Sequence, residues 1–253
     1  MAPAPRSPGL LWRTLGLLPF PILATSPTIG LAYGSLDGAG IAVVIAILVF
    51  CLGVHEAAHA QVALWCGDST ASDLGRITVD PRSHIDLFQT ILLPLFLYLS
   101  AGFIFGGAKP VPVNPMRLRK PLRDMSLVAI AGPLSNFLLA ILFALILGVL
   151  LHYQVYTRDQ MMVAILTVAV QLNLLLAAFN LMPVPPLDGS RVMTWLLPAH
   201  LRRAYMELER FGLLIVFGLV LFVPGFQGLI RWTMNTLMDV VLWIIEPMLA
   251  LLP

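Results

Sequence analysis

The residues best suited to chemistry lie in one short stretch, His55-Glu56-Ala57-Ala58-His59. Residues four apart share one face of a helix, so both imidazoles can reach a single ion while Glu56 lies beside them. Imidazoles are common ligands of Zn²⁺, and an adjacent carboxylate is suited to accept and return a proton. Ionisable side chains in an apolar helix are costly unless they have a function. The pattern therefore predicts a catalytic zinc site, with a structural polar cluster as the weaker alternative.

A catalytic zinc site needs a third protein ligand and leaves its fourth position for water. Asp188 is the strongest candidate, because it follows an apolar run and a proline-broken turn, Pro183-Val184-Pro185-Pro186-Leu187. Taken alone, this string is also typical of a turn whose Asp caps the next helix. The other candidates are Cys51 on the face of His55, the loop residues His84 and Asp86, and the less favoured His152 and His200 near the ends of apolar runs.

The composition of the 253-residue chain indicates a polytopic membrane protein, because 59% of its residues are hydrophobic and 11% are charged, against about 25% charged in soluble domains. The formal net charge is +2 and the bases are not massed into one patch, so no nucleic-acid partner is expected. We expect a single domain over residues 1–253, with a core over 41–210, an N-terminal span within 1–40 and C-terminal spans within 211–253.

The expected fold is all-α, with about six transmembrane helices, one re-entrant or interfacial hairpin and short extended loops. The first run, Leu15–Tyr33, is broken by prolines and is either a kinked span or a signal sequence. Leu87–Ile104 is interrupted by Pro94 and is followed by glycines, which favours a hairpin over a lipid-facing span. The remaining spans are expected at Ile41–Trp65, Leu127–Leu151, Met161–Leu181, Phe211–Val223 (short) and Leu229–Leu252.

The basic residues indicate how this bundle is oriented, because cytoplasmic segments of membrane proteins are enriched in Lys and Arg. If Leu87–Ile104 re-enters without crossing, only Arg158 and Arg231 lie outside. The bases inside are then Arg6, Arg13, Arg76, Arg82, Lys109, Arg117, Arg119, Lys120, Arg123, Arg191, Arg202, Arg203 and Arg210. A full crossing by that segment would remove most of this asymmetry. The zinc site is therefore expected near the cytoplasmic face.

Several strings resemble those of the site-2 protease family of intramembrane zinc metalloproteases, in its compact bacterial form without a PDZ or CBS domain. The resemblance covers about residues 54–210 and begins with the His-Glu-Ala-Ala-His string. The further strings are Gly67-Asp68, Gly75-Arg76-Ile77-Thr78, Asp80-Pro81 through Asp86, Gly107 through Pro115, Ala131-Gly132-Pro133-Leu134-Ser135-Asn136, and Asn180 through Gly189. Together these strings are highly specific.

The resemblance implies a role for each matching residue. His55, His59 and Asp188 resemble the ligands of one Zn²⁺, and Glu56 resembles the general acid/base. Asn136 resembles an asparagine near the active site that helps hold the substrate or polarise its carbonyl, although an Asn in a span is often simply a contact between helices. Asn180 is given a similar role with less support.

The predicted function is hydrolysis of peptide bonds in membrane-spanning or membrane-anchored substrate proteins, in a bacterial inner membrane and towards its cytoplasmic side. A transmembrane substrate must unwind to expose its carbonyls, and Gly75–Val79 or Ala108–Val113 is a candidate edge for the unwound strand. The alternatives are a catalytically inactive membrane scaffold and a metal transporter. A transporter has no need of Glu56 directly after the first histidine.

Overall fold

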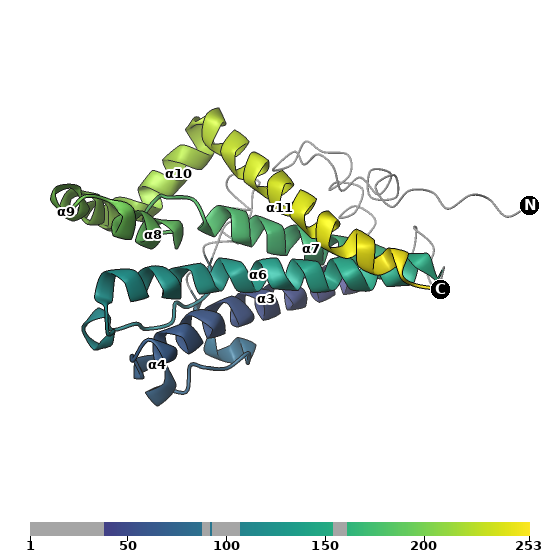
Figure 1. Ribbon diagram of the computed structural model, residues 1–253, viewed down its shortest axis with the longest axis horizontal. Helices are drawn as coiled ribbons and strands as arrows, with labels where there is room; N and C mark the ends of the chain where they lie inside the picture. The colour runs from purple at the N-terminus through teal and green to yellow at the C-terminus, as the bar shows by residue number, and fades with distance from the viewer. Residues whose placement is uncertain (1–37, 88–91, 93–106, 154–160) are drawn as a thin grey trace, which may run out of the picture.

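The computed structural model describes residues 38–87, 92, 107–153 and 161–253, which form helices joined by irregular segments (Figure 1). No β-strand occurs within these ranges, which agrees with the expected all-α class. The apolar run Leu15–Tyr33 and nearly all of Leu87–Ile104 lie outside the described residues. The expected first span and the expected hairpin therefore remain predictions.

Four described helices are long and apolar enough to cross a membrane: α3 (Gly38–Trp65), α6 (Pro121–His152), α7 (Met161–Asn180) and α11 (Pro224–Ala250). They coincide with four of the expected spans, which makes this an integral membrane protein. The shorter elements are α4 (Thr70–Asp73), η1 (Pro81–Ser83), η3 (Pro115–Arg117), α8 (Gly189–Leu196), α9 (Ala199–Glu207), η4 (Leu208–Phe211) and α10 (Gly212–Phe222).

The expected separate crossing at Phe211–Val223 is not confirmed. Helix α10 has 11 residues, or about 17 Å, which is short of the roughly 30 Å hydrocarbon core. Figure 1 shows α10 leaving the end of the bundle that holds α8 and α9, and α11 continuing to the opposite end. There the His152 Nε2 lies 3.2 Å from the Pro253 carbonyl oxygen. The two helices thus traverse the bundle once, and the chain turns between them at Val223-Pro224.

Helix α6 lies at the centre of the bundle and packs against α3, α7, α8 and α11. Small residues spaced four apart let these helices approach closely. Close packing of this kind stabilises helix contacts within lipid, where there is no hydrophobic driving force between helices. The opposite face of α6 is lined by large apolar side chains that suit contact with lipid. The inward stripe is Gly132, Asn136, Ala140, Ala144 and Gly148, and the outward stripe is Ile130, Leu134, Leu138, Leu142 and Ile146.

The hydrophobic core lies among α6, α7 and α11, and includes the fully buried Leu147, Leu174, Val241 and Ile245. Helix α3 packs against α6 and α7, and its contact with α6 brings residues 55–59 of α3 beside residues 128–136 of α6. The polar residues of α3 therefore face another helix and not lipid, which removes most of their cost in a membrane.

Candidate metal centre

Helix α3 places the two histidines one above the other on its buried face. His55 is 5% exposed and His59 is 8% exposed, and their rings lie 4.6 Å apart between centroids. This arrangement follows from the spacing of four residues, which is close to one helical turn. The helix therefore presents two imidazole nitrogens at a single point against α6.

Asp188 reaches the same point from the turn that links α7 to α8. It is the N-cap residue of α8, yet its side chain makes no capping hydrogen bond, so the capping interpretation of this Asp does not hold. Gly189 is required beside it, because a Cβ there would lie 2.3 Å from the Leu181 carbonyl oxygen. The Asp188 Oδ2 thereby reaches the point at which the two imidazoles of α3 meet.

Three donor atoms converge in a nearly regular triangle. The Nε2 atoms of His55 and His59 lie 3.0 Å apart, and the Asp188 Oδ2 lies 3.2 Å from the first and 3.4 Å from the second. Nitrogen and oxygen ligands of a tetrahedral Zn²⁺ lie about 2.0 to 2.2 Å from the ion, which separates them from each other by about 3.3 to 3.6 Å. The spacing of the three atoms therefore fits one face of a zinc tetrahedron.

The hydrogen-bond partner of each Nδ1 determines which nitrogen of that imidazole carries the proton. The Nδ1 of His59 lies 2.7 Å from the Val128 carbonyl oxygen, and the Nδ1 of His55 lies 2.6 Å from the Asn136 Oδ1. A proton on each Nδ1 leaves a lone pair on each Nε2, facing a buried Asp188 Oδ2 that has no hydrogen-bond partner among the described residues. Three electron-rich atoms at this distance repel each other unless a cation lies between them, so the donor set fits a metal.

Gly132 provides the space at this point. A Cβ at position 132 would lie 2.4 Å from the His59 Nε2 and 2.6 Å from the His55 Cε1. Any side chain here would therefore occupy the volume on which the ligand atoms converge. The sequence string around Gly132 carried the family resemblance, but this specific role was not predicted.

Glu56 lies beside the ligands and is held by the segment that precedes α6. Its Oε2 accepts a hydrogen bond of 2.8 Å from the Val111 N–H. That segment is anchored in turn, because the Lys109 N–H donates to the His84 carbonyl oxygen at 2.7 Å and Arg76 donates to the Lys109 carbonyl at 3.0 Å. The irregular segment 107–114 therefore orients Glu56, and the Val111 N–H is not available as part of a free strand edge.

The two predicted asparagines lie in different surroundings. Asn136 is fully buried and contacts His55, so the structure brings it to the site as a partner of a ligand and not as an exposed group. Asn180 donates its Nδ2 to the Leu176 carbonyl oxygen, one turn earlier in α7, at 3.1 Å. Asn173, which is fully buried, was missed by sequence reasoning, although a polar residue within an apolar span is itself a signal of function.

The alternative ligands are not brought to this point. Among the described residues, the only group that could hold a metal is His55, His59 and Asp188. Cys51 contacts Asn173 through its sulfur at 3.1 Å, and the His84 Nε2 donates to the Thr78 carbonyl oxygen at 2.7 Å. The remaining candidates, Asp86, His152 and His200, are likewise outside the group.

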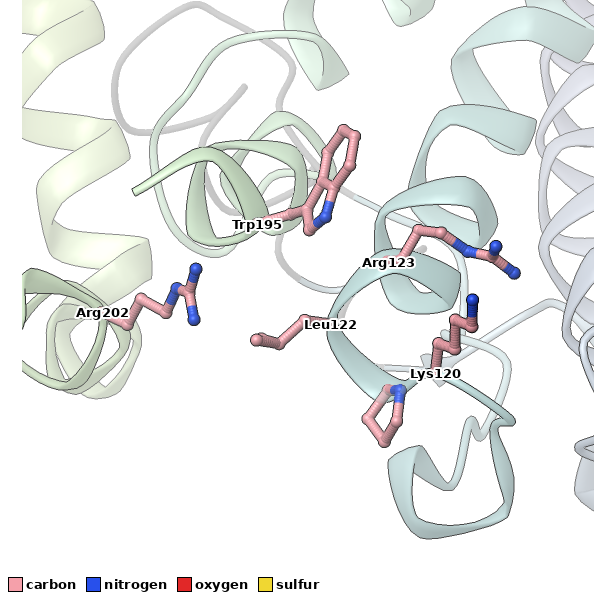
Figure 2. A pocket seen from close by; sticks show the side chains of 6 residues that line it. Lys120, Leu122, Arg123, Trp195 and Arg202 are labelled. Atoms are coloured by element: carbon pink, nitrogen blue, oxygen red, sulfur yellow. The ribbon is translucent and has the colours of Figure 1, made fainter. Parts of the chain in front are cut away.

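An open cavity of about 490 Å³ lies elsewhere, between the start of α6 and helices α8 and α9 (Figure 2). Its lining carries basic and apolar side chains and none of the three ligands. The lining residues are Lys120, Pro121, Leu122, Arg123, Trp195 and Arg202. The basic side chains that line the cavity thus add to the positive charge at this end of the bundle.

Known proteins with similar sequences match most of the length of this chain. The sequence model described as Peptidase family M50 matches residues 43–158 and 152–223. The protein named "Putative zinc metalloprotease YwhC" of Bacillus subtilis is 41% identical over 194 residues, which cover 74% of this chain and 83% of that protein. "Putative zinc metalloprotease Rip2" of Mycobacterium tuberculosis is 32% identical over 194 residues, which cover 75% and 71%. No solved structure gives a significant match.

Proposed function

Because this chain belongs to peptidase family M50, the site-2 protease family, we propose that it is an intramembrane endopeptidase that cuts membrane-spanning proteins near their cytoplasmic end. Family membership makes it a zinc metalloprotease. The observation that carries the proposal is the triangle formed by His55, His59 and Asp188 on apolar helices of the bundle. We propose the substrate class, the orientation, the ligand set and the role of Glu56.

The ligand set that we propose is the two imidazoles and the Asp188 carboxylate. When bound there, zinc would supply Lewis acidity, which lowers the pKa of a bound water and polarises the scissile carbonyl. Asn136 and the Val128 carbonyl keep the two imidazoles oriented for this purpose through their Nδ1 atoms. The Asp188 side chain is 22% exposed, which supports access of water to the site.

The proton transfers are assigned to Glu56. The Val111 N–H holds its Oε2, which leaves Oε1 to take a proton from the attacking water and return it to the leaving amine. A carboxylate in this position distinguishes the proposal from its rivals. A transporter site needs the ligands alone, and an inactive scaffold needs neither the ligands nor Glu56.

The orientation rests on the distribution of charge over the described residues. Every described Lys and Arg except Arg231 lies within residues 76–82, 109–123 or 191–210, the segments nearest α4, α8 and α9 (Figure 1). The opposite end holds His152 and the C-terminus. The excess of basic residues on cytoplasmic segments supports an active site towards the cytoplasm, in a bacterial inner membrane.

Cleavage of a membrane-spanning reporter by the purified protein tests the proposed activity. We expect the reporter to be cut, cutting to stop when a chelator removes the metal, and stoichiometric Zn²⁺ to restore it. Cleavage that persists in the protein shown to be metal-free would contradict the proposal, as would zinc binding without any cleavage of reporters inserted in either orientation.

Labelling of introduced cysteines tests the orientation separately. We expect Arg119→Cys, at an exposed position before α6, to react with a thiol reagent only from the cytoplasmic side. Tyr153→Cys, at the other end of α6 and 47% exposed, serves as the matched control and is expected to react only from outside. Both are made in a Cys66→Ser background, because Cys66 is not fully buried. The reverse pattern would contradict the orientation.

A further inference from the structure

Asn173 on α7 makes no hydrogen bond to the proposed zinc ligands, yet it continues a series of hydrogen bonds that ends on one of them. Its Oδ1 accepts from the Asn136 Nδ2 at 3.0 Å, and the Asn136 Oδ1 faces the His55 Nδ1 at 2.6 Å. Its own Nδ2 donates to the Ala169 carbonyl oxygen at 2.8 Å and to the Cys51 sulfur at 3.1 Å. Asn136, Asn173 and Cys51 are all fully buried.

The donor and acceptor in each of these hydrogen bonds follow from the Ala169 carbonyl at the end of the series. A backbone carbonyl only accepts, so the Asn173 amide must turn its Nδ2 towards Ala169 and its Oδ1 towards Asn136. Asn136 must then donate to that Oδ1 and turn its own Oδ1 towards His55. The His55 Nδ1 must therefore carry the proton, which leaves the Nε2 lone pair facing the metal centre.

The two histidines differ in the kind of group that faces their Nδ1. The His59 Nδ1 faces a backbone carbonyl, that of Val128, whose polarity cannot reverse. The partner of His55 is a side-chain amide, which could rotate by half a turn and present its NH₂ group to the imidazole. Apart from Asn173, the only described group that opposes this rotation is the Cys51 carbonyl, at a long 3.5 Å from the Asn136 Nδ2.

We propose that Asn173 is a positioning residue that locks the Asn136 amide and so selects the metal-binding tautomer of His55. The proposal rests on the ligand set given under the proposed function. It also explains why a polar pair is retained in an apolar bundle, where an amide left without a hydrogen-bond partner is destabilising. Cys51 is a secondary contact, because Asn173 keeps its bond to Ala169 without the sulfur.

The test compares zinc affinity and the tautomer of His55 in the full-length protein, by chelator competition at fixed pH and by ¹⁵N NMR of the metal-free form. We expect Asn136→Leu to weaken zinc binding about 10- to 100-fold, the range for lost partners of metal ligands, and Asn173→Leu or Asn173→Ala to weaken it about tenfold. The Asn173 variants are also expected to show a mixture of His55 tautomers. Cys51→Ala is expected to change neither quantity by more than about twofold.

Two controls separate positioning from general stability. Leu174→Ala, at the next residue of α7 and fully buried in the hydrophobic core, is expected to lower the melting temperature with zinc affinity unchanged. The double variant of Asn136 and Asn173 is expected to bind zinc as Asn136→Leu does, because both act through one path. Additive losses, or an Asn173 variant with unchanged zinc affinity and a single His55 tautomer, would overturn the proposal. Unchanged zinc affinity in His55→Ala would instead overturn the ligand set.

Discussion

The variant Glu56→Gln is expected to retain zinc and to cleave a membrane-spanning reporter about 10²- to 10⁴-fold more slowly than the wild type, the usual contribution of a general acid/base. Glutamine has nearly the same size, and its carbonyl oxygen can still accept the hydrogen bond from the Val111 N–H. It cannot accept a proton from water. The variant should therefore have a lower rate constant of cleavage. Single-turnover kinetics measures this rate constant, and the zinc content is measured in the same sample.

The matched control for this variant is Glu207→Gln on α9. Glu207 has a 55% exposed side chain and pairs with Arg203 at the surface, so the change is expected to leave cleavage within about twofold of the wild type. If Glu56→Gln cleaved at the wild-type rate, Glu56 would have no part in proton transfer. Loss of zinc from this variant would indicate a structural role instead.

The variant Gly132→Ala is expected to bind zinc roughly 10- to 100-fold more weakly. Its methyl group would lie 2.4 Å from the His59 Nε2, so the ligand atoms must move apart. Overpacking of this kind costs about 1 to 3 kcal/mol, and each 1.4 kcal/mol is about tenfold in affinity. Ala is also the better helix former by about 1 kcal/mol, so the cost should appear in zinc affinity, measured by chelator competition, and less in the melting temperature.

Gly148→Ala provides the comparison for this variant on the same helix. Its Cβ would also meet a neighbour at short range, the Leu249 Cδ1 at 2.5 Å, but that atom is the flexible end of a side chain far from the ligands. We therefore expect unchanged zinc affinity. Equal zinc affinity in Gly132→Ala and the wild type would show that the ligands do not converge beside Gly132.

The local sequence pattern was sufficient to predict the parts of the site that depend on one helix or one turn. The spacing of His55 and His59 defines their shared face whatever the helix packs against. The long apolar runs similarly predicted α3, α6, α7 and α11 with ends that differ by a few residues. Asp188 was identifiable because its turn follows a span, although its sequence alone is equally typical of a helix cap.

Features that depend on the register between helices could not be predicted from the sequence. The role of Gly132 requires knowing which turn of α6 faces the histidines, and that of Asn173 requires the registers of α3, α6 and α7 together. The buried contact of Asn136 with His55 was not predicted for the same reason, and the substrate contact of Asn136 stays a prediction. The separate crossing at Phe211–Val223 is not confirmed, because hydropathy does not show how α10 and α11 are arranged along the bundle.

X-ray absorption at the zinc edge of the purified protein tests the proposed metal centre most directly, because it reports the atoms bound to the ion. Two imidazole nitrogens and carboxylate and water oxygens, at about 2.0 to 2.2 Å, are predicted for a site built from His55, His59 and Asp188. The imidazole signal is expected to fall in His55→Ala. A sulfur ligand at about 2.3 Å, which would place Cys51 on the metal, or a spectrum without imidazole would contradict this centre.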